Sequence, residues 1–154
     1  MHESIFMIKD GKTVCLVSPD LEKRIGLAPF SAGLAVGELG KQFSPTLAGA
    51  DLFARVGCRN RFYVSVADNA EQLVLYGRDI MGDSVIDVAT DLGENELVIL
   101  TNRRGDAIGI GRTRFSGRGL LQKGRITITT LADAGRYLRD EGGERQAKMA
   151  RSPR

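Results

Sequence analysis

The chain is poor in the residues that most often build catalytic and metal sites. Its 154 residues include one histidine, His2, and two cysteines, Cys15 and Cys58, which do not stand in a CxxC spacing. That arrangement indicates neither a zinc site nor a disulfide framework, so both cysteines are expected to be reduced, small core residues. GxSxG and HExxH motifs are also missing. We therefore predict a protein that is not an enzyme and needs no cofactor or metal.

Long hydrophobic runs are missing too. No apolar stretch approaches the roughly 18 residues of a membrane span, and the N-terminus lacks the basic-then-apolar layout of a secretory signal. Hydrophobic residues still make up 42% of the chain and charged residues 27%, which is typical of one or two small globular domains. We expect an intracellular monomer, cytoplasmic or, in a eukaryote, nucleolar, with no membrane partner.

The charges are sorted by sign in the second half of the chain. From Asp79 to Glu96 there are six acids and no base, whereas residues 103–125 hold seven bases against the single Asp106. The net charge of +3 is too small to indicate nucleic-acid binding by itself. A stripe of one sign is nevertheless a candidate electrostatic footprint for a polyanion. Its members are Arg103, Arg104, Arg112, Arg114, Arg118, Lys123 and Arg125.

Residues 1–58 are predicted to form an N-terminal α/β module with an antiparallel sheet. Asp10-Gly11 suits the turn of an opening hairpin, Ser18-Pro19 begins a short helix that Gly26 ends, and Thr46 caps a second helix. The alternating, glycine-punctuated stretch from Gly33 favours strand over helix. The predicted strands are Ile5–Ile8 and Thr13–Val17, and the second helix is Thr46–Arg55, closed by Gly57.

Residues 59–140 are predicted to form a second, mainly β domain, so that the fold class is α+β. RFYVSV alternates as a strand, and Asp68 or Asn69 caps a helix that Gly77 ends. Thr130 and Asp133 fit a capping box for a closing helix. The further strands are Val85–Ala89, Glu96–Thr101, Asp106–Arg114 and Arg125–Thr130, and the closing helix is Leu131–Arg139. Residues 141–154 lack periodicity, which predicts a disordered, mildly basic tail.

Two patterns in this half invite a catalytic interpretation and do not support one. Asp79, Asp83, Asp87 and Asp91 recur every four residues, but glycines and β-branched residues interrupt the helix that would align them. The glycines of IGIGRTRFSGRG have neither a following capped helix nor an acid about 20 residues later, as a nucleotide-binding fold requires. The aspartates are better explained as solvated acids, and the glycines as points of close backbone approach in a curved sheet.

The arginines then remain to be explained. Because side chains alternate along a strand, DAIGIGRTR places Arg112 and Arg114 on one face. In RITITT the same alternation points Ile126 and Ile128 inward and leaves outward Arg125, Thr127 and Thr129. Neighbouring strands would bring Arg112, Arg114 and Arg125 together. The intervening loop adds Arg118, Lys123 and Phe115, and a phenylalanine ring can stack on an unpaired base. The arginine guanidinium group can bind two phosphate oxygens at once. The alternative is a solvated strand edge guarded by charge, although acids would guard it equally well.

Several segments, taken in order, resemble the Nip-type (Nip-seven) ribosome-biogenesis factor family, whose members carry a C-terminal PUA domain. ADNAEQLVLYGRDIMGD looks like the opening of that domain, and AVGELGKQFSPTLAGADLFAR is similar to the segment that leads into the linking helix. IGIGRT and TTLADAGRYLRDEG resemble a strand and the closing helix of the domain. The likeness runs from about Ile5 to Glu141, although the family usually has a helix before the first strand.

The resemblance implies a two-domain, non-enzymatic RNA-binding factor of large ribosomal subunit maturation. The N-terminal module would dock pre-ribosomal or exosome proteins, and the PUA pseudo-barrel would bind single-stranded, U- or AU-rich RNA such as rRNA. By position, the RNA-contacting residues would be Arg112, Arg114, Arg118, Lys123 and Arg125. Two alternatives stay open: an RNA-delivery module of a tRNA-modifying enzyme complex, and a protein-binding scaffold whose acidic and basic stretches serve two partners.

Overall fold

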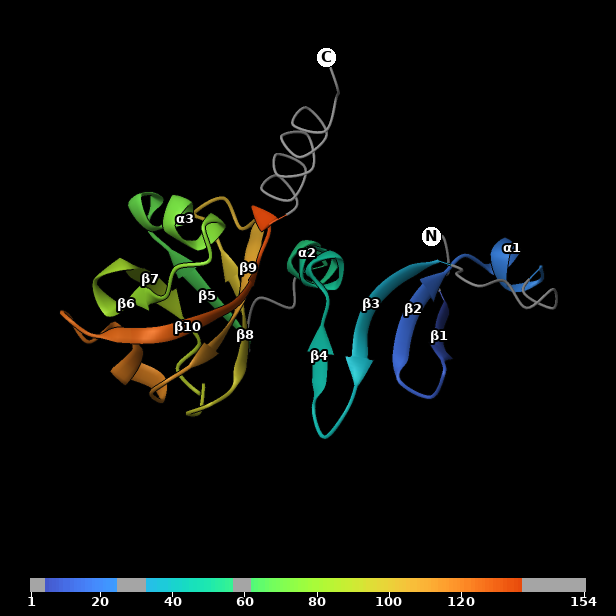
Figure 1. The fold of residues 1–154 in the computed structure, drawn as a ribbon, viewed down its shortest axis with the longest axis horizontal. Helices are drawn as coiled ribbons and strands as arrows, with labels where there is room; N and C mark the ends of the chain where they lie inside the picture. Colours follow the sequence, from blue (N-terminus) through green and yellow to red (C-terminus); the bar gives the residue numbers. More distant parts are fainter. Residues whose placement is uncertain (1–4, 25–32, 57–61, 137–154) are drawn as a thin grey trace, which may run out of the picture.

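A computed structural model describes residues 5–24, 33–56 and 62–136 of the chain. Figure 1 shows two sheets, one from each half of the sequence, with helix α2 (Leu47–Arg55) between them. The predicted domain boundary near residue 58, Gly26, Gly57, Cys58 and the predicted tail lie outside the described residues. No helix among the described residues is long and apolar enough to cross a membrane.

The N-terminal sheet has four antiparallel strands in the order β1-β2-β3-β4. The predicted opening hairpin is confirmed, with Asp10 and Gly11 at positive φ in its turn. The stretch from Gly33 is strand, as expected, but it folds into two strands that pair with each other. The strands are β1 (Ile5–Lys9), β2 (Thr13–Val17), β3 (Leu34–Leu39) and β4 (Phe43–Pro45). Cys15 is buried in β2, as predicted.

Both helices of this half begin at the predicted caps. Ser18 Oγ accepts a hydrogen bond from Leu21 N at the start of α1 (Pro19–Glu22). Thr46 Oγ1 accepts from Gly49 N and donates to the carbonyl of Ala35 in β3. Gly49 allows α2 to lie directly on β3, because a Cβ at that position would stand 1.8 Å from the carbonyl oxygen of Val36. Helix α2 therefore has a fixed position on the N-terminal sheet.

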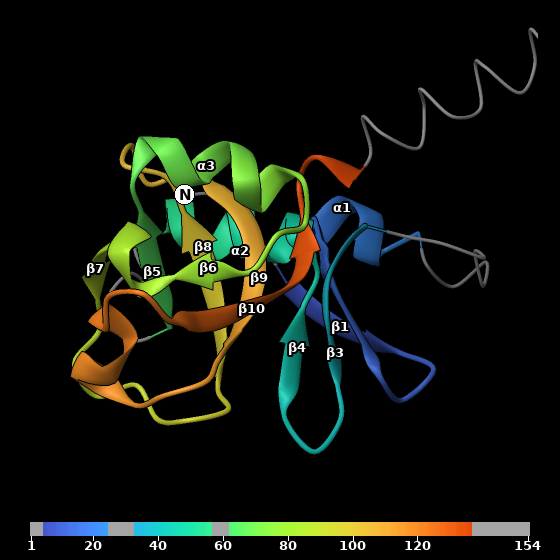
Figure 2. The same ribbon diagram turned by 60° about the vertical axis from the view of Figure 1, so that its left-hand side comes forward.

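The C-terminal half forms a mixed six-stranded pseudo-barrel in the strand order β6-β10-β9-β8-β5-β7. Strands β5 and β8 are parallel, and the other neighbours are antiparallel. Helix α3 (Asp68–Leu75) lies across one end of this barrel, and the short 3-10 helix η3 (Gly117–Leu121) lies at the other (Figures 1 and 2). The strands are β5 (Tyr63–Val66), β6 (Ile80–Met81), β7 (Val85–Val88), β8 (Leu97–Thr101), β9 (Ala107–Thr113) and β10 (Ile126–Asp133).

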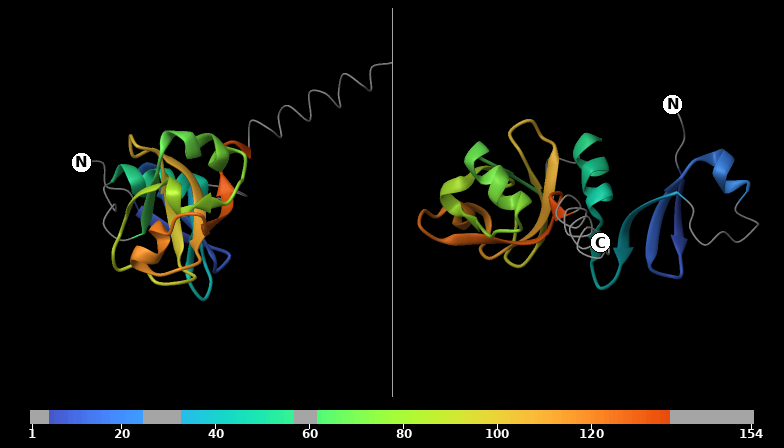
Figure 3. Two further views of the ribbon diagram at one scale, coloured as in Figure 1. Left: turned by 90° about the vertical axis from the view of Figure 1, so that its left-hand side faces the viewer. Right: turned by 45° about the horizontal axis from the view of Figure 1, so that its top comes forward.

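One continuous core of buried aliphatic side chains fills the barrel. Val64, Leu100, Leu120 and Ile128 are among its fully buried members. The predicted role of the strand glycines is confirmed, since a Cβ at Gly109 would stand 2.8 Å from the carbonyl oxygen of Ala132. Helix α2 also packs against β9 and β8 on the outside of the barrel, so it joins the two sheets (Figures 1 and 3).

The prediction of a helix beginning at Leu131 is wrong for the described residues, because β10 continues to Asp133. Thr130 does not cap a helix: its N–H donates to Asp79 Oδ1, and its hydroxyl donates to the carbonyl of Arg78. These contacts hold the β-branched run in the sheet, where such residues pack well. Long-range pairing thus prevails over a capping pattern of short range.

Two smaller predictions also fail. Helix α3 begins one residue earlier than predicted, since its N-cap is Ala67 and neither Asp68 nor Asn69. The alanine side chain cannot accept a hydrogen bond, and Ala67 N donates to the carbonyl of Ser84. In β10, Ile126 is 41% exposed and Thr127 is buried, the reverse of the expected pattern. An irregularity in the pairing with β6 between Ile126 and Ile128 interrupts the alternation there.

Candidate nucleic-acid interface

Residues 115–125 connect β9 to β10 and form what we call the basic loop. It contains η3 (Gly117–Leu121) and lies at the end of the barrel opposite α3 (Figures 1 and 2). Leu120 is fully buried in the core and holds the loop against the barrel. Arg118, Lys123 and Arg125 are all exposed, and none of them forms an ion pair within the part of the chain that the structure describes.

The basic loop is held by backbone contacts at both ends. Gly117 N donates to the carbonyl of Leu92, and Gly124 N donates to Asp83 Oδ2 at 2.6 Å. Gly82 N donates to the carbonyl of Arg125, and a Cβ at Gly82 would stand 2.1 Å from the carbonyl oxygen of Gln122. The loop therefore presents its cations from a fixed backbone, which lowers the entropy lost when a ligand binds.

Phe115 anchors the basic loop rather than projecting from it. Its ring is partly buried and packs against the barrel core. The Arg125 guanidinium lies over this ring, 5.4 Å from the centroid, and also donates to Gln122 Oε1. One face of the ring is thus already occupied by a cation in the structure.

Arg112 and Arg114 lie together at a shallow polar hollow on the outer face of the barrel. Glu94, Asn95, Thr113 and Thr129 complete its lining. Arg112 Nη1 donates to the carbonyl of Asn95 at 3.0 Å, and this asparagine takes a positive φ that turns its carbonyl toward the strand. Arg114 Nε donates to Thr129 Oγ1, and its Nη2 forms a 2.9 Å ion pair with Asp79. Arg112 has no ion pair among the described residues.

The structure thus brings two of the six predicted site residues to one hollow and gives the others different neighbours. Arg112 and Arg114 share the face of Thr129, whereas Arg125 lies over Phe115, whose ring faces the core. Arg118 and Lys123 stand on the basic loop between them in sequence. The partner of Arg114 was missed, since Asp79 lies 35 residues away and only the clustering of acids pointed to it.

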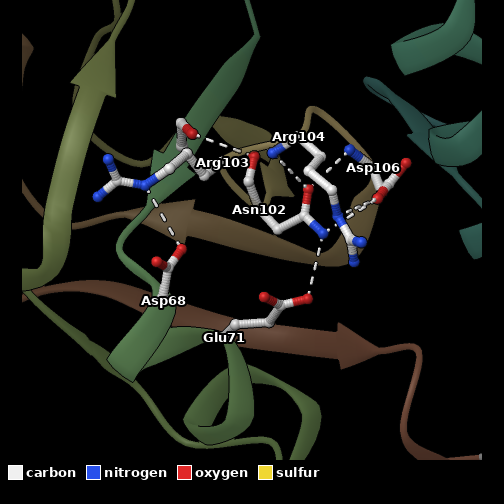
Figure 4. Close-up of polar contacts among 7 residues, drawn as sticks. Asp68, Glu71, Asn102, Arg103, Arg104 and Asp106 are labelled. Atoms are coloured by element: carbon white, nitrogen blue, oxygen red, sulfur yellow. Dashed lines mark hydrogen bonds and ion pairs between the residues drawn. The ribbon is translucent and has the colours of Figure 1, made fainter.

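Arg103 and Arg104, the other two bases of the stripe, lie at the opposite end of the barrel. They belong to the turn of residues 102–106 between β8 and β9, which we call the Asn102 turn (Figure 4). The Arg103 guanidinium pairs with Asp68 of α3 at 3.4 Å, and that of Arg104 pairs with Asp106 at 3.5 Å. Each of these cations therefore already faces a carboxylate.

Asn102 organises this turn from a buried position. Its Oδ1 accepts hydrogen bonds from the backbone N–H groups of Arg104 and Asp106, and its Nδ2 donates to Glu71 Oε1 and Asp106 Oδ2 (Figure 4). Four hydrogen bonds satisfy the whole amide, so Asn102 is a structural residue that ties the turn to α3.

The aspartates that recur every four residues are not gathered in one place. Asp79 holds Arg114 and Thr130, Asp83 holds the backbone of the basic loop, and Asp87 accepts a hydrogen bond from the Tyr63 hydroxyl. Asp79 precedes β6, Asp83 lies in the 3-10 helix Gly82–Ser84, Asp87 lies in β7 and Asp91 lies in the turn after it. The first three therefore serve as local anchors and not as one carboxylate site.

Comparisons with known proteins agree with this architecture. The UPF0113 PUA domain matches residues 62–142, more than half of the chain. A UPF0113 protein of Archaeoglobus fulgidus is 40% identical over 140 residues, which span 88% of this chain and 78% of the relative.

Among solved structures, a conserved PUA domain protein from Thermoplasma acidophilum matches with a TM-score of 0.58 at 12% identity, over 86% of this chain and 76% of that one. A hypothetical protein from Pyrococcus horikoshii OT3 matches with the same TM-score at 18% identity, over 86% and 74% of the two chains. At these identities the likeness establishes the fold, which is PUA-like as expected. PUA domains typically bind RNA. By its sequence match and its two-part fold, the chain belongs to the UPF0113 PUA domain family.

Proposed function

We propose that this protein is a non-catalytic RNA-binding factor that holds single-stranded RNA through the basic loop and Arg112. The observation that carries the proposal is a set of exposed cations on a fixed loop that form no ion pair with any described residue: Arg118, Lys123 and Arg125. Guanidinium groups bind phosphate oxygens in a forked geometry, and such contacts position a backbone without encoding its sequence.

The biological setting that we propose is that of the Nip-type factors: maturation of the large ribosomal subunit on pre-rRNA, with the RNA exosome as a further partner. The order of segments in the sequence supports this finer assignment, whereas the match to a UPF0113 protein of Archaeoglobus fulgidus supports only the family on which it builds. A preference for U- or AU-rich RNA belongs to the same proposal. It is tested by comparing oligouridine with oligocytidine of equal length.

Partner docking is assigned to the N-terminal sheet in this proposal. The cross-strand pairs Phe6–Leu16 and Leu16–Leu34 place three apolar side chains on one face of β1, β2 and β3. Phe6, Ile8 and Leu34 are 57%, 59% and 45% exposed. Contiguous exposed apolar side chains are typical of surfaces that bind other proteins.

The salt dependence of RNA affinity tests the proposal. If about four phosphates are neutralised on a single strand, the plot of log affinity against log salt has a slope near −3, so raising salt from about 50 to 200 mM weakens binding about fiftyfold. Replacing Arg118, Lys123 and Arg125 together by alanine makes the slope shallower by about 2.

The matched control replaces Arg103 and Arg104, whose cations face carboxylates, and leaves the slope at its wild-type value. A wild-type slope near zero, or an unchanged slope in the loop variant, contradicts RNA binding by these residues. A stoichiometric enzyme recovered with the protein would favour the delivery-module alternative, and binding of proteins without any RNA would favour the scaffold.

A further inference from the structure

An apolar cleft lies where the two halves of the molecule meet. It encloses about 520 Å³, a volume typical of ligand sites. One wall comes from the N-terminal half, with Phe43 of β4 and Phe53 of α2, and the other comes from the barrel, with Phe62 and the start of β8. Phe43 and Phe62 are 37% and 50% exposed.

The ring of Phe43 is held in place before any ligand arrives. It packs edge to face against Phe53, with ring centroids 6.0 Å apart and an angle of 72° between the planes. It also lies against Gly37, where a Cβ would stand 2.2 Å from a ring atom. A ring fixed in this way presents its remaining surface as a flat, preorganised wall.

The cleft lies beside the hollow that holds Arg112. Leu97, which lines the cleft, is the direct cross-strand partner of Arg112, which in turn lies opposite Thr129 of β10. Cα atoms of such antiparallel partners are about 4.5–5.5 Å apart and their side chains share a face. Apolar walls and an unpaired guanidinium thus adjoin across one strand spacing on the outer face of the barrel.

The acids near this junction do not cancel the charge of Arg112. The Glu96 carboxylate lies at the edge of the cleft and accepts a hydrogen bond from Gly93 N at 3.0 Å, within its own turn. Asp79 is paired with Arg114. Glu94 lines the hollow but forms no ion pair with Arg112.

We propose that the cleft between Phe43 and Phe62 receives one unstacked base of the bound RNA while Arg112 holds a phosphate of the same strand segment. This inference rests on the proposed RNA binding and adds to it a second platform, built by both halves of the chain. Aromatic rings beside a cationic track are the general means of holding single-stranded nucleic acid, because every base offers a flat face for stacking. The adjoining cation is what favours a nucleotide over an apolar peptide as the occupant.

The test compares ring removal with charge removal by measuring affinity for a short oligouridine. Replacing Phe43 and Phe62 together by leucine keeps an apolar cleft but removes the flat rings. We expect affinity to fall roughly five- to hundredfold, with an unchanged salt slope because no phosphate contact is lost. Arg112→Ala should instead make the slope shallower by about 0.7. Phe62→Tyr, which keeps the ring, should retain wild-type affinity.

Tyr76→Ala removes an exposed ring at the end of α3, outside the residues that line the cleft, and serves as the control, with no effect expected. Circular dichroism and thermal unfolding verify that each variant is folded. If the folded double leucine variant binds RNA with wild-type affinity, the base site is overturned and the proposed function stands. The same result is expected if the cleft receives a protein side chain. If the wild-type protein binds no oligouridine at any salt concentration, the proposed function fails, and this inference fails with it.

Discussion

The two ends of the barrel both carry arginines on a connection between strands, and they use them differently. At one end, Arg103 and Arg104 face Asp68 and Asp106 on a turn organised by buried Asn102. At the other, the basic loop is fixed through its backbone and its buried Leu120, which leaves its cations unpaired among the described residues. An arginine-rich stretch therefore does not define a binding surface until the position of each carboxylate is known.

This comparison explains why only part of the seven-base stripe is assigned to RNA. An ion pair between exposed side chains contributes about 0–1 kcal/mol to stability, so the pairs of the Asn102 turn do little to hold the fold. They do, however, lower the positive potential that a phosphate would meet. The basic loop is anchored without an ion pair among the described residues, so no described carboxylate neutralises any of its three cations.

The largest expected effect is on stability, at the Asn102 turn. Asn102→Ala removes four hydrogen bonds from a buried side chain and leaves the backbone N–H groups of Arg104 and Asp106 without their acceptor. We expect the free energy of unfolding in urea to fall by about 3 kcal/mol. RNA affinity, measured where the variant is folded, should not change. Asn69→Ala, at an exposed position in α3, is the control. An equal loss of stability in this variant, or weaker RNA binding by the Asn102 variant, would contradict the structural role of the Asn102 turn.

A smaller effect is expected from giving the hollow a second unpaired cation. Asp79→Asn removes the ion pair with Arg114 while keeping an oxygen that accepts from Thr130 N. The freed guanidinium should make the salt slope for single-stranded RNA steeper by about 0.7 and raise affinity at low salt. Asp20→Asn, an exposed acid in α1, makes the same change in net charge. If both variants raise affinity equally, net charge and not the position of Arg114 is responsible.

The smallest effect concerns the exposed ion pairs themselves. Arg103→Ala and Arg104→Ala should each change the free energy of unfolding by no more than about 0.5 kcal/mol, because both partners are well solvated. Thermal and urea unfolding of the two single variants measure this. A loss above about 1.5 kcal/mol would mean that the ion pairs, and not Asn102, hold the turn.

Local signals in the sequence were sufficient for most of the elements. Signals that act within a few residues are found as predicted: the Asp10-Gly11 turn, the helix caps Ser18 and Thr46, and the helix end at Gly77. The closing helix failed because Thr130 is held by Arg78 and Asp79, some 50 residues earlier in the chain. Contacts between distant segments carry no local pattern, so propensity alone could not show them.

The same limit applies to the candidate interface. The sequence showed which residues are basic but not that Asp79 pairs with Arg114, or that Arg125 lies over Phe115. The aromatic cleft was missed altogether, since Phe43, Phe53 and Phe62 come from three different elements that meet only when α2 packs against the barrel. Alternation did place Arg112 and Arg114 on one face, because both lie in or next to a regular strand.

Photo-crosslinking of RNA to the protein tests the central claim most directly. Single-stranded RNA containing 4-thiouridine is bound to the wild-type protein, irradiated, and the crosslinked peptides are identified by mass spectrometry. We predict crosslinks in residues 112–125 and none in residues 102–106 or at the start of α3. Crosslinks concentrated at the Asn102 turn, with the basic loop unmodified, would contradict the assignment of RNA to that end of the barrel.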